Sequence, residues 1–191
     1  MNDCWVKRAQ QSGYRSRAAY KLLAINEQDH LFKPGMMVID LGASPGSWSQ
    51  VARQLIEPAG CVLALDRLPM QPIEGVEFIL GDFANEETKK ALTLLMHGRQ
   101  PSLVISDMAP NISGHNTLDQ GRIFSLAHLA LEFCQDYLAV GGNFVVKVFQ
   151  GEDFVAYLSE LKRVFKKVMS RKPQASRSDS KEIFLVGKYK V

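Results

Sequence analysis

The chain of 191 residues is 46% hydrophobic and 23% charged, which is typical of a folded globular protein and excludes a disordered or fibrous one. Its length suits one domain, and no apolar run approaches the roughly 20 residues of a membrane helix, so we expect no membrane partner. The net charge of +3 is uneven, because residues 1–21 hold five Lys and Arg against one acid, residues 162–191 hold ten against two, and the middle is acidic.

The N-terminal segment is the first of these basic regions. Residues 1–29 are expected to form a basic stretch followed by an extra helix over 16–28. The segment lacks the apolar core of a secretory leader, so we expect a cytoplasmic protein. Basic charge at both ends of the chain is typical of a protein that grips a polyanion, and a nucleic acid is the expected partner, with a merely solvated basic surface as the alternative.

Strand-length apolar runs alternate with helical patterns along the middle of the chain. The runs cover residues 37–41, 61–65, 76–80, 103–106 and 143–149. Helices are expected over residues 47–56, 123–138 and 154–165. This alternation predicts an α/β fold with a mostly parallel sheet and helices on both faces.

The C-terminal part is less regular. An ambiguous run over residues 167–172 precedes a polar loop from residue 173 and a clear strand over 182–189. The tight loop favours an antiparallel pair at the edge of the sheet. No internal repeat or linker is visible, so we expect a single domain over residues 1–191.

No metal site is expected. The cysteines, Cys4, Cys61 and Cys134, lie far apart and form no CxxC pair, and the four histidines show no HExxH spacing. We interpret these side chains as packing or solvated groups.

The stretch DLGASPGSW, residues 40–48, joins the first expected strand to the helix after it. Gly42 and Gly46 would let a ligand press against the backbone, and Pro45 suits the first helical turn. The spacing Gly42-x-x-x-Gly46 differs from the GxGxxG of dinucleotide sites. We interpret the turn as a site for a nucleotide-like cofactor, with a tight turn that binds no ligand as the alternative.

Two acids follow the next two strands. Asp66 ends the second strand, where a carboxylate can accept hydrogen bonds from both ribose hydroxyls. Asp82 and Phe83 follow the third strand and would suit an adenine amino group and ring. Acids at both strand ends favour an adenosine ligand without phosphates, and S-adenosylmethionine fits better than NAD. Taken singly, each acid could instead cap its own loop.

Lys147 stands among apolar residues in GGNFVVKVFQG, residues 141–151. Both faces of such a strand are normally covered, and an unpaired buried ammonium costs several kcal/mol, so Lys147 needs a partner or a cavity. It lies toward the carboxyl end of its strand, where open sheets bind ligands. Asp107 is the obvious nearby anion, and Glu182 is another if the last strand pairs with this one. A lysine that snorkels to the sheet edge is the alternative.

Together these motifs resemble the FtsJ family of RNA ribose 2′-O-methyltransferases. Lys21, Asp107, Lys147 and Glu182 match the family's K-D-K-E tetrad in order. DLGASPGSW, LALDRLP, GDF, SDMAPN and SRSDSKEIF extend the match from about residue 14 to the end. The resemblance implies a Rossmann-like class I fold that depends on S-adenosylmethionine, with seven mostly parallel strands and an antiparallel last strand. This chain departs from many members at Ser47, where they have a second glycine, and in the short segment before Tyr14.

The resemblance also implies roles for individual residues. Lys147 would act as base or orienter of the 2′-hydroxyl, Asp107 and Glu182 as its electrostatic partners, and Lys21 as support for the acceptor ribose. The implied cofactor contacts are Gly42, Gly46, Trp48, Asp66, Asp82, Phe83 and Asp107. Phosphate contacts are expected from Arg15, Arg17, Lys172 and Arg177.

The implied substrate is a uridine in the A-loop of large-subunit ribosomal RNA, free or within the large ribosomal subunit or its precursor, and a monomer is expected. A base methyltransferase fits less well, because DMAPN at residues 107–111 has neither the aromatic residue nor the cysteine of such enzymes. Two further interpretations stay open. One is a noncatalytic RNA-binding or ribosome-assembly protein with a vestigial cofactor pocket, and the second is a 2′-O-methyltransferase of transfer RNA.

Overall fold

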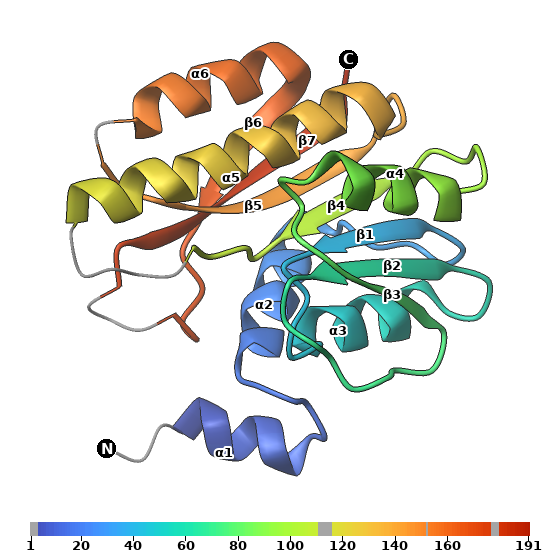
Figure 1. The fold of residues 1–191 in the computed structure, drawn as a ribbon. Coiled ribbons are helices and arrows are strands. Elements are labelled where there is room, and N and C mark those ends of the chain that lie inside the picture. Colours follow the sequence, from blue (N-terminus) through green and yellow to red (C-terminus); the bar gives the residue numbers. More distant parts are fainter. Residues whose placement is uncertain (1–3, 111–115, 152, 177–179) are drawn as a thin grey trace.

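The computed structural model describes residues 4–110, 116–151, 153–176 and 180–191, apart from the side chains of 116–120 (Figure 1). Its centre is a seven-stranded sheet in the order β3-β2-β1-β4-β5-β7-β6. The strands are β1 (Met37–Leu41), β2 (Cys61–Asp66), β3 (Val76–Leu80), β4 (Leu103–Ser106), β5 (Asn143–Phe149), β6 (Phe165–Arg171) and β7 (Glu182–Lys190). The predicted α/β sheet is confirmed.

The last strand is the exception to the parallel pattern. The pairs among β3, β2, β1, β4 and β5 are parallel, whereas β7 is antiparallel to both β5 and β6. The antiparallel last strand is therefore confirmed; it lies between β5 and β6, and its antiparallel pair with β6 forms the edge of the sheet as predicted. Its register sets Phe184 opposite Lys147 and Glu182 opposite Phe149. The first residue of β7 is thereby brought to the carboxyl end of β5.

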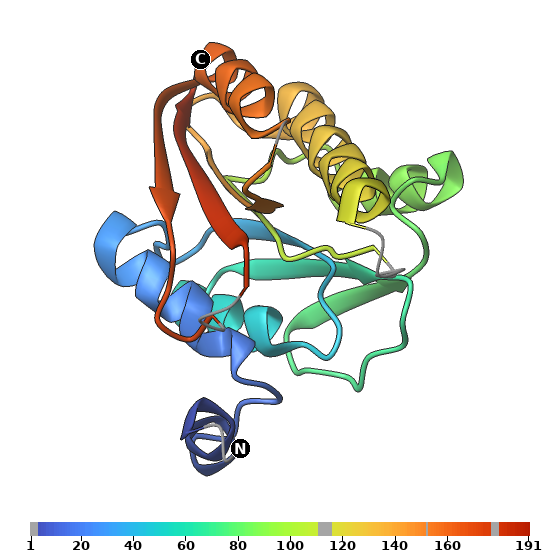
Figure 2. The same cartoon turned by 90° about the vertical axis from the view of Figure 1, so that its left-hand side faces the viewer.

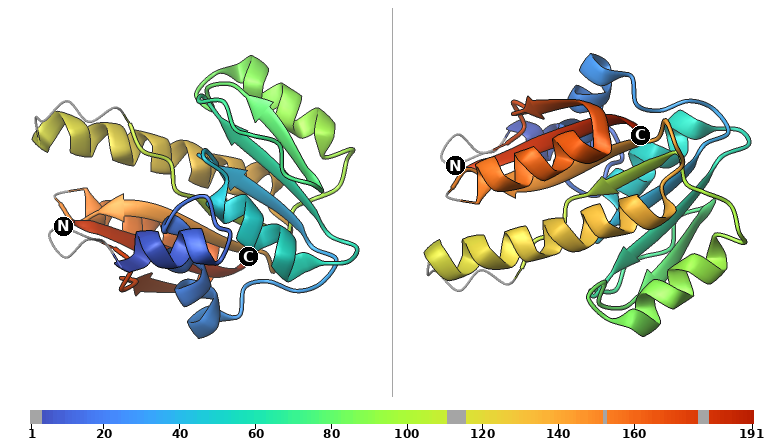
Figure 3. Two further views of the ribbon diagram at one scale, coloured as in Figure 1. Left: turned by 90° about the horizontal axis from the view of Figure 1, so that it is seen from below. Right: turned by 90° about the horizontal axis from the view of Figure 1, so that it is seen from above.

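Helices cover both faces of the sheet (Figure 2). They are α1 (Cys4–Gln11), α2 (Ala18–Asp29), α3 (Ser47–Ile56), α4 (Glu86–Leu95), α5 (Asn116–Tyr137) and α6 (Phe154–Val164). In Figure 3, α1, α2 and α3 are seen from below and α5 and α6 from above. Two of these helices, α1 and α4, lie outside the predicted set. The first has eight residues and buries only Ala9, so its apolar pattern is weak.

Two apolar layers hold this arrangement together, because successive side chains of a strand point to opposite faces. Ile39 and Phe144 belong to the layer under α4, α5 and α6, whereas Val38 and Val145 belong to the layer under α2 and α3. By this alternation, Asp40 and Lys147 lie on the α2 and α3 side of the sheet.

The N-terminal and C-terminal parts of the chain are tied together beside α2. Asp29 at the end of α2 accepts hydrogen bonds from Arg171 of β6, from Nε at 2.9 Å and from Nη2 at 2.8 Å. Lys188 of β7 donates to the backbone oxygen of Asp29 at 2.7 Å. Ahead of α2, the guanidinium of Arg8 lies 4.9 Å from the ring centroid of Tyr20 and so attaches α1.

Candidate active site

The turn between β1 and α3 is built around glycine. Gly42 has φ of +80°, and a Cβ there would lie 2.8 Å from the backbone nitrogen and Cα of Met108. Only glycine combines this conformation with so close an approach of two chain segments. The backbone nitrogens of Gly42 and Ala43 donate to the oxygen of Leu65 at 2.8 and 3.1 Å. We call residues 43–46 the cofactor loop.

Asp66 holds the cofactor loop from the end of β2. Its Oδ2 accepts a hydrogen bond from the backbone nitrogen of Ser44 at 2.9 Å, and its Oδ1 accepts one from Leu68 at 2.8 Å. Asp82 similarly accepts at Oδ1 from the backbone nitrogen of Ala84 at 2.9 Å. Because a carboxylate oxygen has two lone pairs, both acids keep acceptor capacity for a ligand hydroxyl or amino group.

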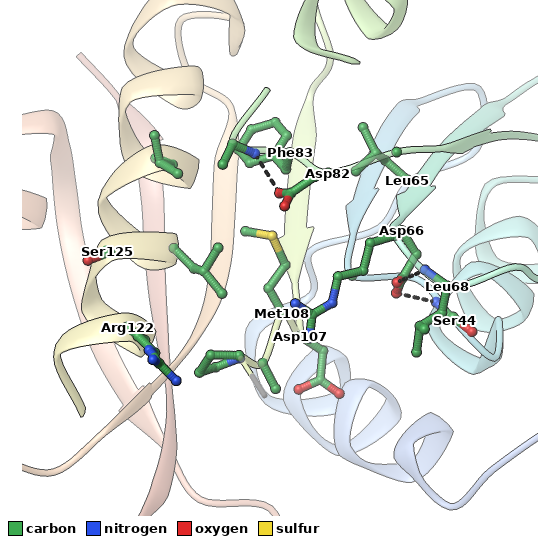
Figure 4. Close-up of a pocket in the computed structure, with 18 residues that line it drawn as sticks. Ser44, Leu65, Asp66, Leu68, Asp82, Phe83, Asp107, Met108, Arg122 and Ser125 are labelled. Carbon is green, nitrogen blue, oxygen red and sulfur yellow. Dashed lines mark hydrogen bonds between the residues drawn. The ribbon is translucent and has the colours of Figure 1, made fainter. Parts of the chain in front are cut away.

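A cavity of about 420 Å³ lies at these strand ends, and its size falls within the range of small-molecule sites. Figure 4 shows Asp66, Asp82 and Asp107 around it, with Arg122 and Ser125 of α5 across from them. Its wall consists of Gly42, Ser44, Leu65, Asp66, Arg67, Leu68, Gly81, Asp82, Phe83, Ala84, Asp107, Met108, Ala109, Pro110, Arg122, Ser125, Leu126 and Leu129. Three carboxylates and an apolar wall suit an adenosine ligand, while Arg67 and Arg122 add two positive charges that the sequence pattern did not predict there.

Three of the residues predicted to contact the cofactor do not have side chains that face the cavity freely. Phe83 lines the cavity, but its ring is buried and packs edge-on against Phe133. Neither Gly46 nor Trp48 is in the cavity wall. The Trp48 ring is buried, its Nε1 donates to the oxygen of Ala18 at 2.9 Å, and its centroid lies 5.6 Å from that of Phe184.

The four predicted catalytic side chains meet as two ion pairs beside the cavity. Lys147 Nζ lies 2.9 Å from Asp107 Oδ1 and donates to the backbone oxygen of Asp107 at 2.8 Å. Lys21 Nζ lies 2.6 Å from Glu182 Oε1. The four side chains are between 9% and 19% exposed, so burial strengthens both pairs. Asp107 also belongs to the cavity wall and therefore joins the two parts of the site.

The two pairs influence one another electrostatically. Burial raises the pKa of Glu182, but its interactions with Lys21 and Ser176 and the positive charge of Lys147 outweigh burial, so the pKa lies below its ordinary value. Glu182 therefore stays a carboxylate at neutral pH. It contacts Lys21, and its effect on Lys147 is the longer-range one.

Asp40 is a buried acid whose position the sequence pattern did not single out. It is fully buried on β1, and its Oδ2 accepts a hydrogen bond of 2.6 Å from Ser49 Oγ. Its Oδ1 has no hydrogen-bond partner among the described residues. Burial raises the pKa of Asp40 to about 7, and the negative charges of Asp107 and Asp66 add to the rise against the effect of Ser49. An acid within an otherwise apolar strand, MVIDL, is the signal that could have found it.

The predicted RNA contacts lie toward the two ends of the chain. Lys172 Nζ donates to the oxygen of Ser180 at 3.2 Å in the loop before β7. Arg17 lies at the start of α2, and Arg177 lies outside the described residues. Arg15 already donates three hydrogen bonds to backbone oxygens of other loops.

Metal-ligand clusters and membrane spans are both absent from the described part of the chain. Within it, no three His, Cys, Asp or Glu side chains gather as metal ligands. Its helices are all too short or too polar to cross a bilayer.

The chain matches FtsJ-like methyltransferases over residues 14–190. A Chromobacterium violaceum protein named Ribosomal RNA large subunit methyltransferase E is 54% identical, over 98% of this chain and 92% of its own. A protein of the same name from Neisseria meningitidis serogroup C is 52% identical, over 100% of this chain and 92% of its own.

Solved structures are similar as well. A candidate ribosomal RNA methyltransferase of Plasmodium falciparum superposes with a TM-score of 0.84 at 28% identity, covering 93% of this chain and 98% of that one. A candidate methyltransferase of Streptococcus mutans in complex with SAH gives a TM-score of 0.55 at 14% identity, covering 91% and 95%. The second likeness is one of fold alone.

Proposed function

The chain belongs to the FtsJ-like methyltransferase family, and from this premise we propose that it methylates the ribose 2′-hydroxyl of a uridine in large-subunit ribosomal RNA. The cofactor is S-adenosyl-L-methionine. Methylation of ribosomal RNA is supported by the names of relatives that match this chain over nearly its whole length. The choice of the 2′-hydroxyl, of uridine and of the A-loop is the proposal.

The observation that carries the proposal is the ion pair of Lys147 and Asp107 at the cavity edge. A ligand in the cavity and an acceptor hydroxyl at Lys147 share Asp107 as a neighbour. Both contacts of the Lys147 ammonium described above go to Asp107, which leaves a third tetrahedral direction of Nζ for the hydroxyl. An acceptor ribose bound at Lys147 would therefore have its hydroxyl oxygen close to a cofactor bound in the cavity.

The residues divide the work of the reaction. S-adenosylmethionine supplies an electrophilic methyl group. We assign Lys147 to orienting the hydroxyl or accepting its proton, with Asp107 fixing the position of Nζ. Lys21, held by Glu182, supports the acceptor ribose. Asp66 and Asp82 hold the adenosine part through hydroxyl and amino groups.

The wider setting is also a proposal. The acceptor is free ribosomal RNA, the large ribosomal subunit or its precursor, and the protein works as a cytoplasmic monomer with one domain over residues 1–191. Arg17, Lys172 and Arg177 are proposed to contact RNA phosphates, because the two ends of the chain carry its excess of basic residues.

Lys147→Ala tests the catalytic part. We expect methyl transfer to fall by at least about a hundredfold, because the group at the hydroxyl is lost, while S-adenosylmethionine binding stays near wild type. Tritiated methyl transfer to ribosomal RNA and calorimetry give the two quantities. Lys90→Ala, which removes an exposed lysine of α4, is the matched control and should leave both unchanged. Full turnover by Lys147→Ala would refute the assignment.

Mapping the modified nucleotide tests the substrate. Ribosomal RNA from cells that lack the protein should lose one ribose methyl group on a uridine of the A-loop, as read by mass spectrometry. Purified protein should restore it on that RNA or on the isolated subunit. An unchanged modification pattern would favour the noncatalytic alternative, and a loss in transfer RNA would move the substrate there.

A further inference from the structure

The partly exposed side chain of Arg15 donates hydrogen bonds to backbone carbonyl groups of two separate loops. Its Nη1 donates to the oxygen of Pro45 at 2.9 Å and to that of Gln71 at 2.6 Å, and its Nη2 donates to the oxygen of Pro72 at 2.9 Å. Pro45 belongs to the cofactor loop, whereas Gln71 and Pro72 belong to the loop between β2 and β3. One guanidinium therefore fastens both loops to the segment before α2.

The two loops lie close together where Arg15 joins them. A Cβ on Gly46 would lie 2.7 Å from Arg15 Nη1, 2.8 Å from Ile73 Cδ1 and 2.9 Å from Met70 Sδ. Ser44 Oγ donates to the oxygen of Pro69 at 3.2 Å, which is a second link between the loops. The loop between β2 and β3 thus packs against the cofactor loop, and Arg15 is hydrogen-bonded to both.

The segment that carries Arg15 is itself fixed on α3. The backbone nitrogen of Arg15 donates to Gln50 Oε1 at 2.9 Å, and Gln50 Nε2 donates to the oxygen of Gly13 at 3.0 Å. Ser16 Oγ and Ser47 Oγ share a hydrogen bond of 2.8 Å. These hydrogen bonds attach the backbone around Arg15 to α3.

We propose that Arg15 is a positioning residue that holds the cofactor loop in its binding conformation and so sets the affinity for S-adenosylmethionine, instead of contacting an RNA phosphate. The inference depends on the cavity as the cofactor site and not on the choice of RNA. The planar guanidinium spreads its donors over separate nitrogens and so reaches carbonyl oxygens of two loops, whereas the three donors of a lysine ammonium all diverge from one atom. A phosphate contact, in contrast, is largely served by either cation.

The test compares Arg15→Gln and Arg15→Lys with Lys7→Gln, which removes one exposed positive charge from α1. We expect both Arg15 variants to weaken S-adenosylmethionine and SAH binding on the order of tenfold, the value of one hydrogen bond from a charged group. RNA binding measured with saturating SAH should stay within twofold of wild type. Lys7→Gln should bind both cofactors as wild type does. Calorimetry and filter binding supply the constants, and circular dichroism verifies folding.

The opposite result overturns the proposal. It consists of unchanged cofactor affinity in Arg15→Gln with weaker RNA binding that Arg15→Lys restores. If Arg15→Gln does not fold, Arg15→Lys decides alone, because a lysine with wild-type cofactor affinity is incompatible with a three-carbonyl clamp. Wild-type protein that fails to bind S-adenosylmethionine would instead refute the cofactor site itself.

Discussion

Asp40 has a raised pKa in the folded protein, which makes its contribution to stability depend on pH. The pKa is about 7 in the fold and 3.8 as the ordinary value. When an acid has a higher pKa in the folded protein than in the unfolded one, the free energy of unfolding is highest below the unfolded pKa. It decreases as the pH rises and reaches its lower value once the pH has passed the folded pKa. Asp40 therefore opposes folding most strongly above about pH 7.

Asp40→Asn should remove this opposition, because asparagine is neutral at every pH and close in shape to the protonated acid. We expect little change in the free energy of unfolding near pH 4 and a gain that grows toward pH 8, with roughly 4 kcal/mol as its upper limit at about 1.4 kcal/mol per pKa unit. Urea unfolding at several pH values measures it.

The matched control is Asp136→Asn, which neutralises an exposed acid of α5 and should show no such trend. If Asp40→Asn instead lowers the free energy of unfolding equally at all pH values, the raised pKa of Asp40 does not contribute to the pH dependence of stability.

At the scale of elements, Gly42 is where β1, the cofactor loop and the segment after β4 converge. Its φ of +80° closely matches that of Gly35, at +81°, but a Cβ on Gly35 would meet nothing within 4 Å, whereas one on Gly42 would meet the backbone of Met108. A substitution at Gly35 therefore tests backbone strain alone, whereas one at Gly42 tests the same strain together with a steric clash.

Gly35→Ala should destabilise the protein by about 1 kcal/mol, the usual penalty of a side chain in this conformation. Gly42→Ala should destabilise it by at least about twice as much and should also weaken S-adenosylmethionine binding, because Met108 or the loop has to shift. Thermal unfolding and calorimetry supply both quantities. Equal effects of the two substitutions would show that the close approach to Met108 is unimportant.

The parts of this architecture that could be predicted are those with strong local signals. The apolar runs located the strands, and Lys147 was conspicuous as one charge in such a run. Helix α1 was not predicted because its polar sequence buries almost nothing. The pairing of Lys21 with Glu182 and the carbonyl contacts of Arg15 depend on how distant segments pack, which no local pattern encodes.

At the scale of the whole molecule, Asp29 joins α2 to the C-terminal hairpin of β6 and β7. The carboxylate is 3% exposed and its partner Arg171 is 24% exposed. Removing one charge of such a pair leaves the other without its buried partner, while water can still reach part of Arg171.

We therefore expect Asp29→Asn to lower the free energy of unfolding by about 2 kcal/mol in urea denaturation. The control is Glu57→Gln, which breaks the ion pair with Arg53 on α3, where Glu57 is 58% exposed. That change should stay within about 0.5 kcal/mol. Equal, small effects would mean that Asp29 does not bind the two ends of the fold together.

The place of β7 between β5 and β6 has a consequence for the order of biosynthesis. Until β7 emerges from the ribosome, β6 has no neighbour in the described sheet and the edge of β5 is open. Glu182, the first residue of β7, reaches Lys21 only then. Contacts between segments as far apart in the sequence as Lys21 and Glu182 form slowly during folding. A nascent chain can therefore complete the sheet and the Lys21–Glu182 pair only after β7 has been synthesised.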